Sequence, residues 1–419
     1  MKKIIEDVRK NVIPTKKLEQ EKSRVATIAF DLVDRQVSKY PQIVQVEFGG
    51  SYAKGTWLPE KADIDIFLKF KKTTPEKKFS EIAQKIGFTA LKKYKPYVRY
   101  SEHPYVEAQV KRTRVNVVPC YDVPKGRWQS AADRSSFHTA FMLESLTGQM
   151  KNDVRLLKEF LKCNNVYGAE IAKQGFSGYV AEVLIYNFRS FEGVIKKIAK
   201  IKRNQVIGNA SKKFDTPIVI MDPIDDQRNL AAAISTENIG KFVLVCRKFL
   251  KKPSGSFFKS KPSSKKVLKN SFVVKFNYKP RSPDIIWGQI KRAATALSTQ
   301  MGVEGFNVLR HMAFSDEKNQ ACLIFEFDSL DIPKDRVHEG PEFFSEADSA
   351  SFIGKNSKKS EMLWINNKGK ILSLQKRKHS NAKSFLQDLL KNNLERSGIP
   401  KGLKADIKKG FKITPRKKH

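Results

Sequence analysis

The stretch FGGSYAKGTW at residues 48–57, followed by ADIDI at residues 62–66, decides the fold of this chain. The pattern predicts a strand, a glycine-rich turn, the start of a helix, a loop and a second strand. Glycine lets a backbone approach a ligand closely, and a helix N-terminus offers free N–H groups and positive potential to a phosphate. We therefore expect Gly50, Ser51 and Lys54 to bind the phosphates of a nucleotide.

The two aspartates of the second segment predict a metal site. Asp63 and Asp65 lie two residues apart in a strand, so their side chains leave the same face of the sheet. Adjacent carboxylates repel each other unless a cation lies between them, and hard oxygen ligands with a phosphate co-ligand suit Mg²⁺. Such metals activate an attacking hydroxyl and stabilise a pyrophosphate leaving group. Asp-x-Asp alone is usually a solvated strand face, but the turn eleven residues upstream favours the metal.

The charge of the chain points to nucleic acid. Its 419 residues include 80 Lys and Arg against 43 Asp and Glu, a formal net charge of +37. A protein this basic repels itself unless a polyanion is near, and Lys and Arg bind nucleic-acid phosphates with release of counterions. A generally basic proteome or association with the ribosome would give the same composition. Charge alone does not say which nucleic acid is bound.

Other global features predict a cytoplasmic protein of several domains. The length suggests two to four domains. No run approaches the roughly 20 apolar residues that a membrane span needs, and the N-terminus lacks the apolar region of a secretory signal. The cysteines lie far apart without a Cys-x-x-Cys pair, which argues against a zinc site and for a reducing compartment. The sequence leaves the oligomeric state open, with a homodimer as one alternative.

We expect three domains, at residues 1–140, 141–257 and 258–419, in an α/β plus α+β multidomain fold. The first is predicted to hold a helix at 24–40, strands at 43–48 and 62–70, and a hairpin of 105–110 and 114–118 with the basic turn Lys111-Arg112-Thr113. The second is predicted to be helical, with Asn152 as an N-cap and helices at 178–190 and 238–251.

The third domain alternates strand and helix again. Strand 271–278, helix 283–301, and strands 305–314 and 321–328 predict a ferredoxin-like unit, preceded by a linker at 252–270 and followed by a helix at 381–396. The tail, residues 401–419, carries eight Lys or Arg against one acid. We expect it to be disordered until it meets phosphate.

The pattern Gly50-Ser51, eleven residues, then Asp63-Ile64-Asp65 resembles the polymerase-β-like nucleotidyltransferase superfamily, which includes poly(A) polymerases and CCA-adding enzymes. The fuller string GGSYAKGTWLPEKADIDIF is similar to the archaeal, class I CCA-adding enzymes. Further matches follow in the family's order: VVPCY at 117–121, ADRSSFH at 132–138, VRLLKEFLK at 154–162, YGAE at 167–170, GFSGY at 175–179 and DPIDDQRNLAA at 222–232. The resemblance covers about residues 45–250.

The resemblance implies a fold, an activity and a set of site residues. The fold is a nucleotidyltransferase head, a helical centre and an RNA-binding C-terminal part. The activity is template-independent addition of C, C and A to the 3′ end of tRNA from CTP and ATP with Mg²⁺. The implied roles are triphosphate binding by Ser51 and Lys54, metal binding by Asp63 and Asp65, nucleotide contact by His138, Lys158 and Tyr167, and recognition of the base edge by Arg228. Arg is common at the position of Lys54.

The residues around Lys158 also carry a prediction of their own. Arg155, Lys158 and Lys162 are three and four apart, so they share one helix face. Such a face is most often a solvated stripe.

One position departs from the family. The third metal carboxylate of the family stands two residues before Val-Pro-Cys-Tyr, where this chain has Asn116. Strand alternation places Val115 and Val117 in the core and Asn116 on the metal face. Asn offers a carbonyl oxygen to Mg²⁺ but accepts no proton, so it cannot be a general base. Three explanations compete: the enzyme works with Asn, a nearby acid such as Asp122 or Glu107 substitutes, or the chain is an engineered or inactive form.

Two other functions fit parts of the pattern. A poly(A) polymerase or oligoadenylate synthetase shares the metal site and differs in product. A non-catalytic RNA-binding relative would have lost activity at Asn116. Single-nucleotide assays separate these alternatives, because a CCA-adding enzyme uses CTP first and stops after one A.

Overall fold

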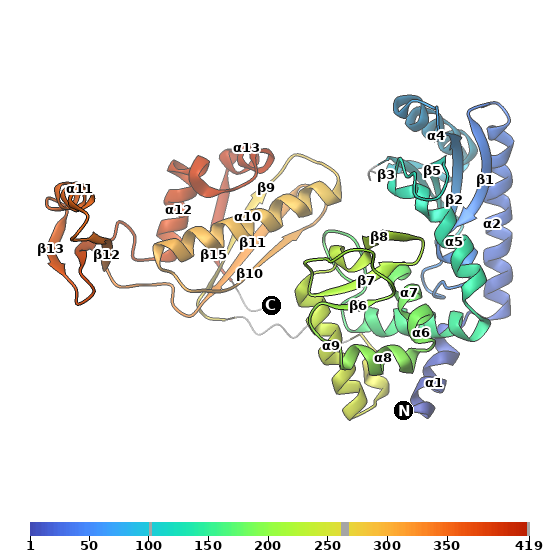
Figure 1. Ribbon diagram of the computed structural model, residues 1–419. Helices are drawn as coiled ribbons and strands as arrows, with labels where there is room; N and C mark the ends of the chain where they lie inside the picture. Colours follow the sequence, from blue (N-terminus) through green and yellow to red (C-terminus); the bar gives the residue numbers. More distant parts are fainter. Residues whose placement is uncertain (100–102, 261–267, 417–419) are drawn as a thin grey trace. The chain divides into compact units, whose positions relative to one another are not determined.

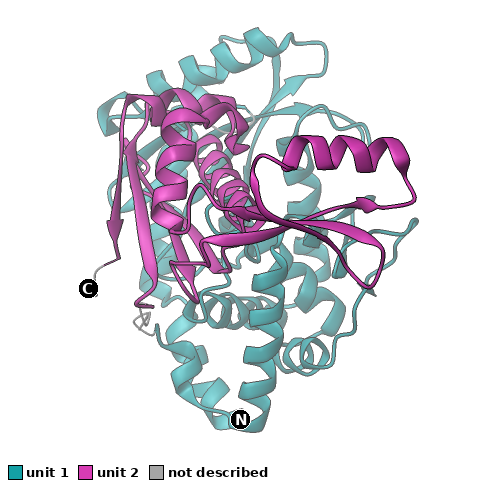
Figure 2. Ribbon diagram, turned by 90° about the vertical axis from the view of Figure 1, so that its left-hand side faces the viewer, with its two compact units in different colours: residues 1–263 teal, residues 264–419 magenta. Residues whose placement is uncertain are grey.

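The computed structural model describes residues 1–99, 103–260 and 268–416. The chain divides into two compact units, Met1–Ser263 and Ser264–His419, which Figure 2 colours separately. Each unit has its own hydrophobic core. No helix in these described ranges has the length and apolar character of a membrane span.

The first unit contains a mixed sheet in the strand order β1-β2-β5-β4-β3, of which Figure 1 labels β1, β2, β3 and β5. Its strands are β1 (Ile43–Gly49), β2 (Ile64–Lys71), β3 (Tyr97–Arg99), β4 (Tyr105–Val110) and β5 (Thr113–Asp122). β2 and β5 pair in parallel and the other neighbours are antiparallel. Helices α2 (Lys16–Val37) and α4 (Glu76–Ala90) share a core with one face of the sheet. The opposite face is therefore left for polar side chains.

Two predicted boundaries in this part change. The helix predicted at 24–40 begins at Lys16, because the side chain of Thr15 accepts a hydrogen bond from the backbone N–H of Leu18. Its first turns are polar, so the apolar stripe is visible only later. The hairpin turn is Lys111-Arg112, since Thr113 is already paired with Val110 in the ladder.

The rest of the first unit is mainly helical. Its helices are α1 (Lys2–Val12), α5 (Arg134–Ser145), α6 (Gly148–Cys163), α7 (Gly178–Phe188), α8 (Phe191–Ala199) and α9 (Thr236–Lys251). Short strands β6 (Gln205–Ile207), β7 (Ile218–Asp222) and β8 (Asp225–Asn229) form a small sheet beside them. α1 belongs to this helical core through Ile5, and Arg9 forms an ion pair of 2.6 Å with Asp153. The first residues of the chain thus pack against the helical part.

Two predictions for the helical part are wrong. Asn152 is not an N-cap: α6 begins at Gly148, and the hydroxyl of Thr147 accepts the backbone N–H of Met150. The predicted linker at 252–270 begins inside the fold, because Phe257 and Phe258 pack against the ring of Phe160. Aromatic burial there outweighs the loop-like composition. Residues 261–267 of that segment lie outside the described residues.

The second unit is built on a four-stranded antiparallel sheet in the order β10-β11-β9-β15. Its elements are β9 (Ser271–Asn277), α10 (Pro283–Glu304), β10 (Val308–Ser315), β11 (Gln320–Phe327), α12 (Ala382–Asn392), α13 (Lys401–Lys409) and β15 (Phe411–Pro415). The three helices share one apolar core with the sheet. The helix predicted at 381–396 ends four residues earlier, at Asn392.

Between β11 and α12 lies an insertion that the sequence analysis did not anticipate. It consists of β12 (Asp335–Glu342), α11 (Glu346–Asn356), β13 (Ser360–Ile365) and β14 (Lys370–Lys376), with the strand order β12-β14-β13.

The prediction of a disordered tail is wrong for residues 401–416. Leu403 and Ile407, four residues apart on α13, are buried in the core, and β15 pairs with β9. Asp406 is 2% exposed; it accepts the backbone N–H of Lys279 at 3.0 Å and forms an ion pair with Arg281. The apolar spacing on the helix thus outweighs the local excess of charge. Residues 417–419 lie outside the described residues.

Because the tail is part of the core, removing it should unfold more than the tail. We expect Leu403→Ala to destabilise the second unit by about 2 to 5 kcal/mol, the usual cost of a large-to-small change in a core. Hydrogen exchange of β9 and α10 amides measures this loss, and Lys409→Ala, at an exposed site of the same helix, is the control. Faster exchange confined to 401–416 would contradict it. Whether the tail contributes to RNA binding is then testable with Lys408→Gln, Lys409→Gln and Lys412→Gln, whose side chains are exposed.

Candidate active site

The glycine-rich turn is pressed against the second aspartate. Gly50 begins helix α3 (Gly50–Lys54) with a φ of +64°, a conformation that L side chains rarely adopt. A Cβ atom at this position would lie 1.9 Å from Oδ2 of Asp65. Glycine is therefore required here for two reasons: the positive φ of the backbone and the close approach to Asp65. This contact brings the turn and the Asp-x-Asp strand into one site.

Three polar side chains form a row across neighbouring strands. Asn116 of β5 pairs with Asp65 of β2 on one side and with Glu107 of β4 on the other. Val115 and Val117 are fully buried on the opposite face, as the alternation predicted. The side-chain amide of Asn116 donates to Oδ1 of Asp65 at 2.8 Å. The row therefore places Asn116 beside Asp65.

The electrostatics of this row suit a cation. Burial raises the pKa of Asp65, against the opposing effect of the Asn116 hydrogen bond. Oδ1 of Asn116 is buried and has no hydrogen-bond partner among the described residues. A buried carboxylate beside an unpartnered carbonyl oxygen is a donor set that fits a hard divalent cation.

Asp63 stands next to this pair and has a partner of its own. Its carboxylate accepts from Nε of Arg114 at 3.1 Å, and about 30% of its side chain is exposed. Its charge contributes to the raised pKa of Asp65, so the two carboxylates are close enough to interact. No cluster of three or more His, Cys, Asp or Glu suited to a metal occurs in the described ranges. The candidate metal site therefore combines two aspartates with an asparagine.

A cleft of about 490 Å³ opens in front of Asp65 and Asn116, within the size range of small-ligand sites. It brings together most of the predicted site residues. Its lining comprises Gly50, Ser51, Lys54, Asp65, Phe67, Tyr105, Asn116, Val118, Ser135, His138, Thr139, Lys158, Tyr167, Gly178, Tyr179 and Glu182. Asp63 and Arg228 are not among these residues.

Two lysines in the cleft share one buried carboxylate. Nζ of Lys54 lies 2.5 Å from Glu182, and Nζ of Lys158 lies 3.2 Å from it. Lys158 also donates to Thr56, through its carbonyl at 3.0 Å and its hydroxyl at 3.1 Å. Burial works to raise the pKa of Glu182, but the two ammonium groups hold it at about 2. The cluster carries one excess positive charge facing the cleft.

Glu182 was missed by the sequence analysis, although a signal was present. It is the one charged residue in GYVAEVLIYNF, the otherwise apolar and aromatic sequence of α7.

The solvated stripe expected on the neighbouring helix α6 is largely buried instead. Arg155 and Lys158 are 7% and 2% exposed, and only Lys162 lies on the surface, paired with Glu60. The helix face is therefore largely buried against the loop after α3, where Arg155 bonds the carbonyl of Trp57 at 3.1 Å.

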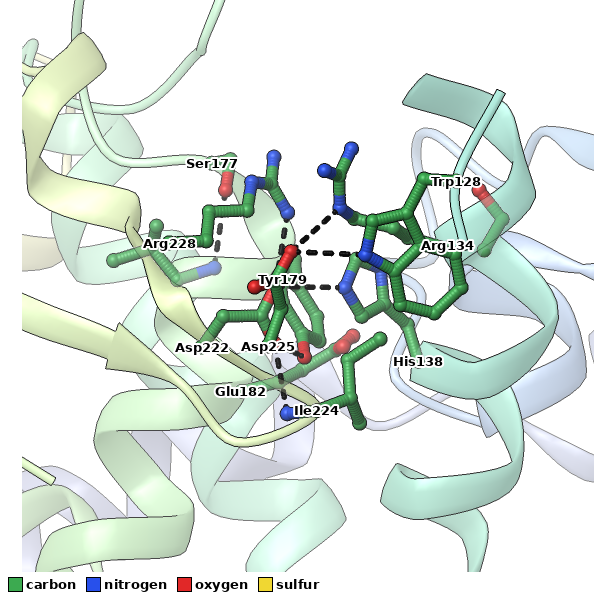
Figure 3. Close-up of polar contacts among 12 residues, drawn as sticks. Trp128, Arg134, His138, Ser177, Tyr179, Glu182, Asp222, Ile224, Asp225 and Arg228 are labelled. Carbon is green, nitrogen blue, oxygen red and sulfur yellow. Dashed lines mark hydrogen bonds and ion pairs between the residues drawn. The ribbon is translucent and has the colours of Figure 1, made fainter. Parts of the chain in front are cut away.

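His138 and Arg228 converge on one aspartate, as Figure 3 shows. Asp222 accepts from Arg228 at 2.9 Å and from the hydroxyl of Tyr179 at 2.8 Å, and it lies 3.0 Å from Nε2 of His138. The rings of His138 and Tyr179 are 3.8 Å apart. Burial lowers the pKa of His138, although Asp222 opposes that shift. The four side chains therefore form a connected network beside the cleft.

A second link lies beside this network. Asp225 accepts from Nε1 of Trp128 at 3.0 Å and from Nε of Arg134 at 3.1 Å (Figure 3). Asp222 and Asp225 were not predicted as site residues, because their partners His138, Arg134 and Trp128 lie 84 to 97 residues away along the chain. Together the two aspartates tie the start of α5 to the β7–β8 hairpin.

Comparison with known proteins agrees with this geometry. Three family models match: a nucleotidyltransferase domain at residues 31–140, a tRNA nucleotidyltransferase second domain at 152–259, and a CCA-adding enzyme C-terminal domain at 269–415. The CCA-adding enzyme of Pyrobaculum neutrophilum is 36% identical over 85% of each chain, and that of Saccharolobus shibatae is 32% identical over 98% of this chain and 99% of its own. The chain belongs to the CCA-adding enzymes. Family and strand order together identify it as a nucleotidyltransferase.

The family models divide the site between two parts of the first unit. The nucleotidyltransferase domain model covers Asp65, Asn116 and His138, and the tRNA nucleotidyltransferase second-domain model covers Lys158 and Glu182. Nucleotidyltransferases of this family generally use divalent metal ions. The structural match with a crystal structure of the Cid1 poly(U) polymerase covers 62% of this chain and 98% of that chain. Its TM-score is 0.46 at 13% sequence identity.

Proposed function

We propose that this chain adds C, C and A to the 3′ end of tRNA from CTP and ATP with release of pyrophosphate, using Mg²⁺ held by Asp63, Asp65 and Asn116. The observation that carries the proposal is the single cleft in which the glycine-rich turn, the Asp65–Asn116 pair and two buried lysines meet. Relatives named CCA-adding enzymes match over most of the chain, which supports this product.

The phosphates of the incoming nucleotide would lie along the turn. Ser51 offers a hydroxyl at the start of α3, and Lys54 and Lys158 face the same cleft with one excess positive charge. A triphosphate would take up that charge without displacing Glu182, which holds both ammonium groups in place. Buried cations act strongly on phosphate because the surrounding dielectric is low.

Mg²⁺, when bound, would polarise the attacked phosphate and lower the pKa of the RNA 3′-hydroxyl. Asp63 and Asp65 would supply charge to the ion, and Asn116 a neutral oxygen. Asn116 cannot take the proton of the hydroxyl. This chain's residues therefore position the reactants with one fewer acid than the family pattern.

Base choice would come from the network beside the cleft. Arg228 has a side chain about 40% exposed while its guanidinium is fixed by Asp222. A fixed, partly exposed guanidinium can donate hydrogen bonds to the acceptor edge of cytosine or adenine. His138 and Tyr167 would line the neighbouring wall of the nucleotide site.

We further infer that the domains run 1–140, 141–257 and 258–419, and that the last is a ferredoxin-like RNA-binding domain. The antiparallel order β10-β11-β9-β15 supports this topology, since it is the order of a β-α-β-β-α-β unit with an insertion. Exposed Lys408, Lys409 and Lys412 would contact the RNA backbone.

The decisive assay uses tRNA lacking its last three nucleotides, with single labelled nucleotides. We expect one or two C to be added from CTP alone and a single A after them. Long A tracts from ATP alone would instead favour a poly(A) polymerase. No incorporation with Mg²⁺, together with tight tRNA binding, would favour a non-catalytic relative.

The nucleotide site itself is testable by kinetics. We expect His138→Ala, Lys158→Ala and Tyr167→Phe to raise the KM for CTP more than the KM for tRNA. Loss of one charge-assisted contact is worth about tenfold. Steady-state kinetics with each substrate varied in turn measures the difference. An unchanged KM for CTP in all three variants would remove them from the site.

The pH dependence of CTP use gives a further prediction. Burial lowers the pKa of Lys158 to about 8, so the free enzyme loses this positive charge as the pH rises through that value. We expect kcat/KM for CTP to fall above about pH 8, since this ratio reports the free enzyme. Lys158→Arg should keep its charge there and abolish that limb of the profile. The same fall in both proteins would assign it to another group.

A further inference from the structure

A second hollow of about 260 Å³ lies next to Asp63 and is lined by residues outside the nucleotide cleft. Its lining comprises Lys22, Glu60, Lys61, Ala62, Asp63, Glu107, Gln109, Arg112 and Arg114. They come from α2, from the loop before β2 and from the β4–β5 hairpin. The hairpin turn is the basic Lys111-Arg112 segment that the sequence analysis singled out.

Lys22 is an unusual cation in this hollow. It is 9% exposed, and its Nζ donates to the hydroxyl of Thr113 at 2.6 Å. No carboxylate lies within 4.0 Å of it in the described ranges. Burial lowers the pKa of Lys22, although the negative charges of Asp63 and Glu21 oppose that shift. A buried ammonium is costly unless a charge compensates it, so an anion would stabilise it here.

The acids of the hollow are already engaged elsewhere. Glu60 pairs with Lys162, and Glu107 accepts from Tyr97 and from Nε of Arg99 at 3.3 Å. Arg114 lies between Asp63 at 3.1 Å and Glu107 at 4.0 Å. Arg112 and Lys61 are exposed and have no carboxylate partner within 4.0 Å in the described part of the chain. The hollow is therefore positive despite its three carboxylates.

The position of the hollow relative to the two aspartates indicates its ligand. Asp65 faces the cleft that contains Lys54 and Lys158, whereas Asp63 faces this hollow. In nucleotidyl transfer a nucleotide and a primer hydroxyl must reach the metal from different directions, because attack and departure are in line. The cleft supplies the cations for the triphosphate. The second set of cations is then available to the other phosphate-bearing substrate.

We propose that Lys22, Arg112 and Arg114 bind a backbone phosphate at the 3′ end of the RNA substrate and so position its terminal hydroxyl beside Asp63. This inference rests on the proposed function. Arg112 reaches the phosphate from the hairpin turn, and Lys22 approaches from α2. Arg114 contacts both the phosphate and Asp63, which couples RNA binding to the metal ligand.

The test is a double-mutant cycle between protein and RNA. Methylphosphonate replaces, in turn, each of the last three phosphodiesters of a tRNA that lacks CCA, which removes one charge at a time. Arg112→Gln removes the proposed partner, and Lys85→Gln, at an exposed site on α4, is the matched charge control. Dissociation constants are measured by anisotropy, so the readout does not depend on catalysis.

We expect one of the three methylphosphonates to weaken binding by about tenfold in the parent protein and in Lys85→Gln, since a charge-assisted hydrogen bond is worth about that factor. In Arg112→Gln the same methylphosphonate should not weaken RNA binding any further. If the two losses multiply at every position, Arg112 does not bind these phosphates and the inference is overturned.

Two further measurements separate the neighbouring explanations. Arg112→Gln should leave the dissociation constant for CTP unchanged; a weakened CTP affinity would assign the hollow to a nucleotide phosphate and overturn the RNA assignment. Addition of label to the same RNA by the parent protein tests the proposed function separately. Coupling without incorporation would refute the activity and keep the phosphate site.

Discussion

Asp65→Ala is expected to lower the rate of nucleotide addition by at least about 10²- to 10³-fold, the usual effect of removing one electrostatic contact to the transition state. Asp63→Ala should act in the same direction. The physical reason is that these carboxylates carry the charge of the proposed metal site, and Asp65 also lies against the glycine-rich turn at Gly50. Binding of tRNA should change little, because its affinity is spread over many Lys and Arg. Single-turnover CTP addition and tRNA dissociation constants measure the two effects.

The control for this loss is a change that keeps the shape of the site. Asp65→Asn removes the charge with almost no change in volume. Burial raises the pKa of Asp65, so its charge destabilises the folded state in the absence of metal. We therefore expect Asp65→Asn to be inactive and at least as heat-stable as the parent protein in a chelator. Near-normal turnover of either alanine variant in Mg²⁺ would show that the metal site lies elsewhere.

Asn116→Asp is expected to raise the rate of CTP addition by about 10²-fold or more, the lower end of a general-base contribution. The structure adds an expectation about stability. Asn116 now donates a hydrogen bond of 2.8 Å to Asp65, and a carboxylate cannot donate it. Two facing carboxylates should lower the melting temperature in a chelator, and Mg²⁺ should restore it, since a ligand of the folded state stabilises that state. Melting curves with and without Mg²⁺ therefore accompany the rate measurement.

The structure distinguishes the two acids, Asp122 and Glu107, that could substitute for the third carboxylate. Asp122 is exposed at the end of β5, six residues beyond Asn116, which at about 3.3 Å per residue is roughly 20 Å away. Glu107 lies directly opposite Asn116 and is 4% exposed. If Glu107 supplies the acid, Glu107→Gln should silence the enzyme, and Asn116→Asp should leave its rate unchanged. Asp122→Asn is the matched control and should be active.

Local sequence patterns determined the site's framework. Gly50-Ser51 and Asp63-x-Asp65 predicted a glycine-rich turn and a strand with two carboxylates on one face, because glycine and strand alternation act over a few residues. The buried Val115 and Val117 placed Asn116 on the same sheet face as Asp65 for the same reason. The basic tail was misjudged where composition competed with apolar spacing, since Leu403 and Ile407 needed a core to pack against.

The tertiary structure alone decided which charges neutralise one another. Glu182 meets Lys54 from 128 residues away, and Asp222 meets His138 from 84 residues away. Arg114 reaches Asp63 across 51 residues. A buried charge is tolerated only where a partner and hydrogen bonds are present, and long-range packing of α6, α7 and the sheet brings those partners together. No local pattern encodes these distances, so the sequence determined the residue types of the site and the packing determined their pairs.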